Sequence, residues 1–245
     1  MNYNIIILII LILICLYLLT FNESFMNYET IYFKCEYDHP ILSNDTMSDL
    51  EDLLLEFKRY TSEKHITYFA IAGTLIGTVR QGGLMPLDDD IDFGILEKDY
   101  MKFENYSHED FSIRHVFFGY KLFKKKYKGT SKIFIDIMIF RERDGMLKIQ
   151  GTDMWESESL HHDEIFPLIT AKYNDIEITI PNKHIQYLHR AFPKWDTSMR
   201  PSCWHENDEK GICTYKDVLH LPDEFPFDEN NKYRCYSGFP TKSNV

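Results

Sequence analysis

The chain has 245 residues, of which 44% are hydrophobic and 15% aromatic, so its composition excludes a disordered protein and predicts a packed globular body. This length suits one sizeable domain, or one domain with a small appendage. The formal net charge of −11 excludes general nucleic-acid binding, because that mode needs a basic surface. An acidic protein can still bind phosphates, since metal ions supply positive charge locally.

The N-terminal segment is strongly apolar. Ile5–Phe21 carries no charge and is near the lower limit of the ~17–25 apolar residues that a helix needs to cross a bilayer. A cleaved signal peptide is the alternative, but the first residues contain no Lys or Arg and no small-residue cleavage site follows. We therefore expect residues 1–26 to form an uncleaved signal anchor and residues 27–45 a stem. The expected protein is single-pass and type II, with its body in the ER or Golgi lumen.

The cysteines and glycosylation sequons give little further guidance. Apart from Cys15 in the leader, the cysteines are Cys35, Cys203, Cys213 and Cys235, and no CxxC pair supports a compact zinc site. Two disulfides and free thiols both stay open as interpretations. Sequons at Asn22, Asn44 and Asn105 would permit glycosylation in a lumen.

The first predicted elements of the body are a helix, a strand and a second helix. Apolar residues recur at helical spacing over Thr46–Tyr60, which predicts an amphipathic helix. Ile66–Ile71 is a short apolar run typical of a buried strand, and Gly73 and Thr74 then open a brief helix over Leu75–Arg80. This order presents backbone N–H groups to an anion such as a phosphate.

Carboxylates surround the next predicted strand, Ile91–Leu96. Asp90 and Asp92 are separated by one residue, a spacing that puts both side chains on one face of a strand. Two such carboxylates repel each other unless a cation lies between them, and oxygen ligands of this kind suit Mg²⁺. The pattern predicts a metal-dependent phosphoryl-transfer site. The same alternation turns Asp89 away from Asp90 and Asp92 wherever the strand is regular.

A helix over Glu97–Tyr106 and two strands follow. The strands, Phe111–Phe118 and Tyr120–Tyr127, are predicted to join at a tight turn on Gly119. The second strand and its end carry the lysines Lys121, Lys124, Lys125, Lys126 and Lys128. Two interpretations stay open for them: a solvated strand edge, or contact with a phosphate-bearing substrate.

One carboxylate interrupts the strongly β-prone run Lys132–Phe140. Asp136 at its centre is costly to bury unless it is paired, hydrogen-bonded or bound to metal. A carboxylate that hydrogen-bonds a neighbouring loop is the structural alternative. We prefer a third metal ligand, which would meet Asp90 and Asp92 if this strand lies beside Ile91–Leu96.

The C-terminal part is less regular in pattern. We expect a turn at Glu164–Leu168, a strand over Ile176–Pro181 and a helix over Asn182–Phe192. The adjacent His161 and His162 make a poor metal pair and are expected to be exposed.

Three segments of the chain resemble the LicD family, which includes fukutin and the fukutin-related proteins. The segments GTLIGTVRQGG, PLDDDIDFGI and FIDIMIF resemble the family's GTLLGxxRHGGxxPWDDDIDxG and its later strand with a single aspartate. The later EIFPL, ITIP and YLHRAFPKW are also similar to its C-terminal pattern, so the resemblance runs from about Met47 to Trp195.

The resemblance implies an α/β (α+β) nucleotidyltransferase-like fold, in which a mixed sheet is flanked by helices. It places the catalytic domain over residues 46–200, followed by an irregular extension over residues 201–245. Members of the family transfer a phospho-alcohol, such as phosphocholine or ribitol phosphate, from a CDP-activated donor to a sugar hydroxyl, and CMP leaves. The implied partners are this donor, a glycan or glycoprotein acceptor and the membrane, with no nucleic acid.

The resemblance also assigns roles to residues of this chain. Asp90, Asp92 and Asp136 match the family's catalytic carboxylates, which hold Mg²⁺ or Mn²⁺, and Asp136 is in a position to accept the acceptor's proton. The remaining matched residues would contact the donor phosphates or support the ligands; they are Gly73, Thr74, Arg80, Asp88 and Asp89.

The chain departs from the family pattern at two positions. Gln81 replaces the usual His, and Leu87 replaces the usual Trp, which removes an aromatic wall. The second change affects the expected identity of the donor or acceptor more than the chemistry. A GT-A-like glycosyltransferase, which also uses a DxD motif, and an inactive binding protein are the competing hypotheses.

Overall fold

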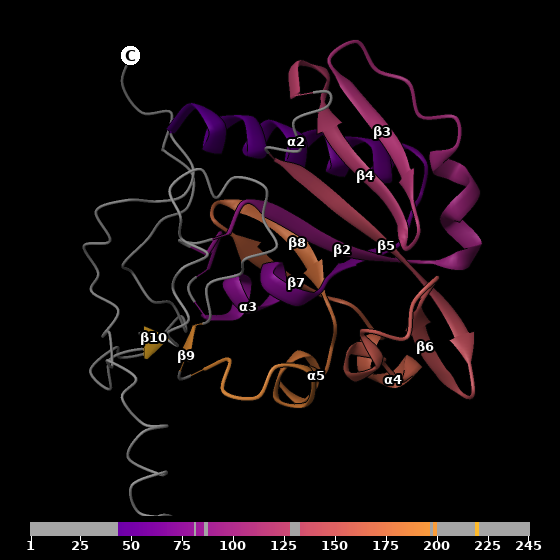
Figure 1. Cartoon of the computed structure of the whole chain (residues 1–245), viewed down its shortest axis with the longest axis vertical. Coiled ribbons are helices and arrows are strands. Elements are labelled where there is room, and N and C mark those ends of the chain that lie inside the picture. The colour runs from indigo at the N-terminus through magenta and orange to yellow at the C-terminus, as the bar shows by residue number, and fades with distance from the viewer. Residues whose placement is uncertain are drawn as a thin grey trace, which may run out of the picture.

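Figure 1 shows a computed structural model of the chain, which describes residues 44–80, 82–85, 88–127, 133–196, 198–199 and 219–220. The expected anchor, the stem, all five cysteines and most of the C-terminal extension lie outside these residues. Within the described part, no helix combines the length and apolar character needed to span a bilayer.

The described body is a mixed α/β fold. Its strands are β1 Tyr68–Ala70, β2 Asp90–Leu96, β3 Phe111–Val116, β4 Gly119–Lys124, β5 Phe134–Arg143, β6 Met146–Ile149, β7 Ile169–Tyr173, β8 Ile176–Ile180, β9 Ser198–Met199 and β10 Leu219–His220. Its α-helices are α2 Asn44–Glu63, α3 Ala72–Arg80, α4 His162–Ile165 and α5 His184–Ala191. Three short 3₁₀ helices complete it: η1 Glu97–Phe103, η2 Lys125–Tyr127 and η3 Glu156–Glu158.

The main sheet is mixed and has six strands. Its order is β1-β2-β5-β4-β3, with β6 paired to the far end of β5. The pair β2–β5 is parallel, whereas β1–β2, β4–β5, β3–β4 and β5–β6 are antiparallel. The hairpin β7–β8 forms a separate two-stranded sheet beside β1, where the Thr179 hydroxyl donates to the Tyr68 carbonyl at 2.5 Å.

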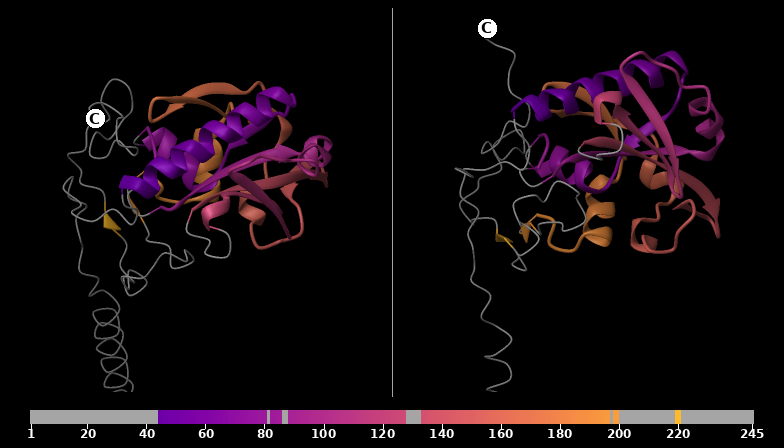
Figure 2. Two further views of the ribbon diagram at one scale, coloured as in Figure 1. Left: turned by 90° about the horizontal axis from the view of Figure 1, so that it is seen from above. Right: turned by 45° about the horizontal axis from the view of Figure 1, so that its top comes forward.

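Helix α2 lies across one face of the main sheet (Figure 2). Its apolar stripe is fully buried, and the ring of Phe57 stacks on that of Phe93 in β2, with the centroids 4.5 Å apart. Alternation along β2 therefore directs Phe93 toward α2 and the neighbouring aspartates toward the opposite face. Helix α3 packs on that opposite face, next to β2.

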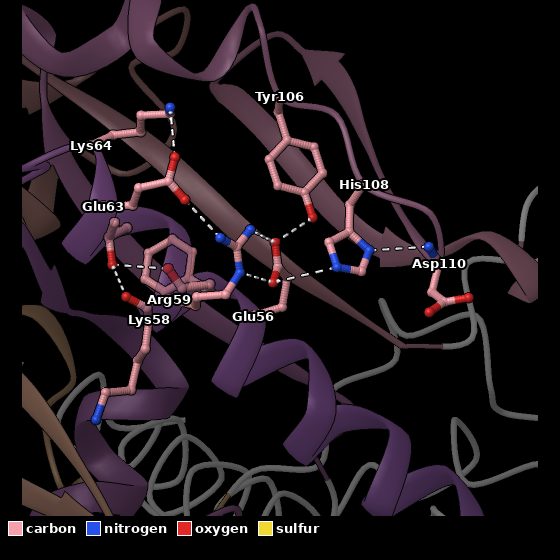
Figure 3. A network of polar contacts seen from close by, with 10 residues as sticks. Glu56, Lys58, Arg59, Glu63, Lys64, Tyr106, His108 and Asp110 are labelled. Carbon is pink, nitrogen blue, oxygen red and sulfur yellow. Dashed lines mark hydrogen bonds and ion pairs between the residues drawn. The ribbon is translucent and has the colours of Figure 1, made fainter.

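A polar network also attaches α2 to the segment before β3 (Figure 3). The buried Glu56 carboxylate accepts from Arg59 Nε at 2.7 Å and Nη2 at 2.8 Å, and from the Tyr106 hydroxyl at 2.9 Å. Burial opposes ionisation of Glu56, but these hydrogen bonds lower its pKa below the usual value. His108 Nε2 lies 3.8 Å from the same carboxylate.

Most of the predicted elements are present, with their ends shifted by a few residues. The predicted turn on Gly119 is wrong, because the chain turns at Phe117 and Phe118 and Gly119 begins β4. A Cβ on Gly119 would lie 2.1 Å from the Ile137 carbonyl oxygen, so this glycine permits close approach of β4 to β5. The helix expected from Glu97 is a 3₁₀ helix that ends at Phe103, and β6 and β7 had no counterpart among the predicted elements.

Truncation of the stacked core ring tests this arrangement. Phe57→Ala is expected to lower the free energy of unfolding by about 3–5 kcal/mol, because it leaves a cavity between α2 and the sheet. Urea denaturation measures the change. Leu55 on the same helix is 44% exposed, so Leu55→Ala is the matched control, with a loss of less than about 1 kcal/mol. Equal losses would contradict the packing.

Candidate active site

The parallel pairing of β2 with β5 aligns Asp92 directly with Asp136. The sequence predicted a metal site shared by Asp90, Asp92 and Asp136 only if these two strands lie side by side, and they do. Oxygen atoms of Asp90, Asp92 and Asp136 all lie within 4.8 Å of one another, and the three residues are 8%, 7% and 7% exposed. The structure therefore brings the three predicted carboxylates together.

The electrostatics of this cluster are unfavourable without a cation. Burial, followed by the charges of Asp90 and Asp136, raises the pKa of the Asp92 carboxyl well above its usual range. Ionisation of all three carboxylates is unfavourable because their negative charges repel one another. A divalent cation between them would offset this repulsion.

A second carboxylate cluster adjoins the first. Oxygen atoms of Asp88, Asp89 and Asp90 also lie within 4.8 Å of one another, and Asp89 is fully buried. Strand β2 begins only at Asp90, so the alternation that would turn Asp89 away does not extend to it. Asp88 and Asp89 thus lie beside the site, and the supporting role assigned to them stays a prediction.

The start of α3 packs against these carboxylates. A Cβ on Gly73 would lie 2.7 Å from Asp88 Oδ2 and 3.5 Å from Asp92 Oδ2, so a side chain there would intrude on the site. The Thr74 hydroxyl accepts a hydrogen bond from the backbone N–H of Asp92 at 2.7 Å, which connects α3 to β2. A phosphate contact by Gly73 and Thr74 stays a prediction.

Arg80, at the end of α3, lies in the interior. It is 2% exposed, and its guanidinium donates to the Trp195 carbonyl at 2.8 Å and contacts the Met85 sulfur at 3.1 Å. These contacts attach α3 to the C-terminal part of the body. Neutralisation of a diphosphate by Arg80 stays a prediction.

The predicted lysine patch divides between the two faces of the sheet. Lys124 binds Asp49 and Asp52 of α2, at 2.6 Å each, and Lys126 also pairs with Asp49. Lys121 instead faces the candidate site, with Nζ 3.1 Å from Asp136 Oδ1. The lysines therefore do not form one patch, since only Lys121 of the described lysines reaches the site carboxylates. Contact with a phosphate-bearing substrate stays a prediction. Lys128 lies outside the described residues.

Glu158 and Tyr187 belong to the surroundings of the site, although no sequence signal pointed to them. The Tyr187 hydroxyl donates to Glu158 Oε2 at 3.1 Å and lies close to the backbone of Ala72, at the start of α3. Burial raises the pKa of Glu158 to about 7, and the charge of Glu158 contributes to the raised pKa of Asp92. By contrast, His161 and His162 are exposed, as predicted.

The donor set suits Mg²⁺ or Mn²⁺. Both ions prefer oxygen ligands. Two ligands of one Mg²⁺ lie at most about 4.2 Å apart, so small side-chain movements would let Asp90, Asp92 and Asp136 share an ion. The raised pKa of Asp92 is consistent with a carboxylate whose ionised form needs a bound cation beside it.

Residues 65–183 match the family described as "LicD/FKTN/FKRP, nucleotidyltransferase domain". The matched segment contains the sheet, α3 and all the site aspartates, so the described body is a nucleotidyltransferase-type domain. This match identifies residues 65–183 as a nucleotidyltransferase domain of the LicD type.

The curated relatives are distant and longer. The chain is 29% identical to an uncharacterized protein of Rickettsia typhi over 160 residues, which cover 63% of this chain and 49% of that protein. It is 22% identical over 170 residues to "Ribitol-5-phosphate transferase FKTN" of Mus musculus, covering 64% of this chain and 36% of that protein. The chain thus spans about half the length of these relatives, or less.

Two solved structures give weak structural matches. The lincosamide antibiotic adenylyltransferase LnuA with lincomycin bound has a TM-score of 0.37 at 16% identity, over 58% of this chain and 86% of that one. ANT(2″)-Ia in complex with adenylyl-2″-tobramycin has a TM-score of 0.36 at 11% identity, over 58% of this chain and 78% of that one.

The close approach of α3 to the carboxylates predicts that Gly73 is needed for metal binding. Gly73→Ala is expected to weaken Mn²⁺ binding by about tenfold, because the added methyl forces the Asp88 carboxylate to move and crowds Asp92. Titration followed by electron paramagnetic resonance measures the affinity. Gly145→Ala is the control for a methyl added away from the site: its Cβ meets no atom within 4 Å, and although its φ of +75° makes alanine strained there, the Mn²⁺ affinity should not change. An unchanged affinity in Gly73→Ala would contradict the packing described.

The raised pKa of Glu158 predicts a pH-dependent stability. The pKa of Glu158 rises from 4.5 to about 7 on folding. The contribution of this group to the free energy of unfolding is therefore fully present below about pH 4 and is lost as the pH rises through about 7. Glu158→Gln mimics the protonated form, and should stabilise the metal-free protein at pH 8 by on the order of 3 kcal/mol.

Urea denaturation at pH 5 and pH 8 in EDTA tests this expectation. The stability difference between Glu158→Gln and the wild type should be much larger at pH 8 than at pH 5. Glu156→Gln is the control on the same short helix, because the Glu156 side chain is 58% exposed. A difference that does not change with pH would show that Glu158 titrates normally.

Proposed function

We propose that the protein is a metal-dependent phosphotransferase of the LicD type. It transfers a phospho-alcohol, such as phosphocholine or ribitol phosphate, from a CDP-activated donor to a glycan or glycoprotein hydroxyl, and it releases CMP. The observation that carries the proposal is the convergence of Asp90, Asp92 and Asp136 from adjacent parallel strands. The match of residues 65–183 to the LicD family and the name of the fukutin relative support the reaction class.

The reaction forms one bond and breaks one. The acceptor oxygen attacks the phosphorus that carries the alcohol, and the bond from that phosphorus to the bridging oxygen of CMP breaks. CMP leaves with the electron pair, and the hydroxyl proton passes to a carboxylate, for which Asp136 is the proposed acceptor. Bound Mg²⁺ or Mn²⁺, held by the three aspartates, would offset the diphosphate charge during transfer.

The remaining residues of the site have positioning roles in this proposal. Gly73 carries no side chain that would push the Asp88 carboxylate away from the first turn of α3, and the backbone N–H groups of that turn are the proposed phosphate contact. Thr74 holds the backbone of Asp92 and so fixes the strand that carries two of the ligands. The proposed setting is a lumen, with the body anchored by the apolar leader.

A donor screen tests the proposal. The full chain in detergent micelles, with Mg²⁺ or Mn²⁺ and a panel of glycan acceptors, is expected to release CMP from CDP-choline or CDP-ribitol, and EDTA should abolish the release. Turnover of a UDP-sugar, with release of UDP and no turnover of CDP-alcohols, would instead establish a glycosyltransferase. Turnover of neither class of donor would favour an inactive binding protein.

Substitution of the proposed proton acceptor gives a second test. Asp136→Asn is expected to lower the rate of CMP release by about a hundredfold or more, since it removes both a metal ligand and the base. Asp163→Asn is the control, because the Asp163 side chain is 71% exposed and its carboxylate pairs with Lys183 in another part of the body. Substantial activity in Asp136→Asn would refute the role given to this residue.

A further inference from the structure

Lys121 is positioned by β4 against the carboxylate of Asp136. The antiparallel register pairs the two residues directly, and Nζ lies 3.1 Å from Oδ1 and 3.4 Å from Oδ2 of Asp136. The ammonium also lies 3.3 Å from the centroid of the Phe134 ring, at the start of β5. A cation over an aromatic face is attracted by the ring quadrupole, so Phe134 holds the charge at the site.

The setting of Lys121 differs from that of Lys124 on the same strand. Three positions along a strand reverse the face, and Lys124 binds two carboxylates of α2 that have no part in the site. Lys121 pairs with a carboxylate that belongs to the predicted metal-binding set. A divalent ion on Asp136 would compete for the same oxygens and repel the ammonium. In the metal-loaded state Lys121 therefore needs another anion close by.

We propose that Lys121 binds a phosphate oxygen of the donor's diphosphate, and that it pairs with Asp136 when the site lacks metal and donor. This inference rests on the proposed function and names a residue of its phosphate subsite. A lysine ammonium is a compact point charge that suits a phosphate oxygen. Phe134 confines the ammonium beside Asp136, where a diphosphate bound to the metal would also lie.

The proposal predicts opposite effects of one substitution on two ligands. Lys121→Met should strengthen binding of Mn²⁺ alone by roughly threefold to tenfold, since it removes a competing cation from Asp136. The same change should weaken binding of inorganic pyrophosphate in saturating Mn²⁺ by about tenfold or more. Lys121→Arg, which keeps the charge, should restore most of the pyrophosphate affinity. Isothermal titration calorimetry on the full chain in detergent measures both ligands.

Lys125→Met is the matched control, because Lys125 is exposed and donates to the His108 carbonyl away from the site. It should leave both affinities unchanged. Equal pyrophosphate affinity in the wild type and Lys121→Met, or no pyrophosphate binding by the wild type, would overturn the proposal. Loss of pyrophosphate binding in Lys121→Met, in a protein that turns over no CDP-alcohol, would support Lys121 as a phosphate ligand and overturn only the proposed donor.

Discussion

Parallel hydrogen bonding between β2 and β5 sets Asp92 beside Asp136, although two 3₁₀ helices and two strands separate these residues along the chain. The register of this pair is fixed from the other face of the sheet. Phe93 and Ile137 are fully buried on the α2 side, and a slip by one residue would turn them toward the carboxylates. The hydrophobic core under α2 therefore specifies the geometry of the polar site.

The site concentrates negative charge that folding must tolerate. Five aspartates lie in two overlapping clusters, and the buried Glu158 adds to the repulsion at Asp92. Lys121 offsets part of this charge at Asp136, and the Thr74 hydroxyl fixes the backbone of Asp92. This residual repulsion opposes folding but favours cation binding, because a bound cation relieves it in the folded state alone.

The sequence predicted the ligand trio because each aspartate stood in a strongly patterned strand. Alternation placed Asp90 and Asp92 on one face, and the apolar run around Asp136 made an unpartnered carboxylate implausible. Glu158 could not be found in this way, since it lies in a short 3₁₀ helix whose sequence has no period. β7 alternates in burial, but it is only five residues long and its inward Ile169 and Ala171 are only half-buried, so its signal is weak. Strand parity separates Lys121 from Lys124, whereas the contact of Lys121 with Asp136 depends on the pairing of β4 with β5, which the sequence does not give.

The C-terminal segment of the described body contacts helix α3, which follows β1 and precedes the site aspartates of β2. The Tyr187 hydroxyl lies close to the backbone of Ala72 at the start of α3, and the Trp195 carbonyl accepts from Arg80 at its end. Ala72 has a φ of +44°, an uncommon conformation for alanine that needs support from surrounding contacts. The segment from Tyr187 to Trp195 thus contacts both ends of the helix that carries Gly73 and Thr74. Because Gly73 and Thr74 lie against the site aspartates, this C-terminal segment supports the site without contributing a carboxylate to the metal-binding set.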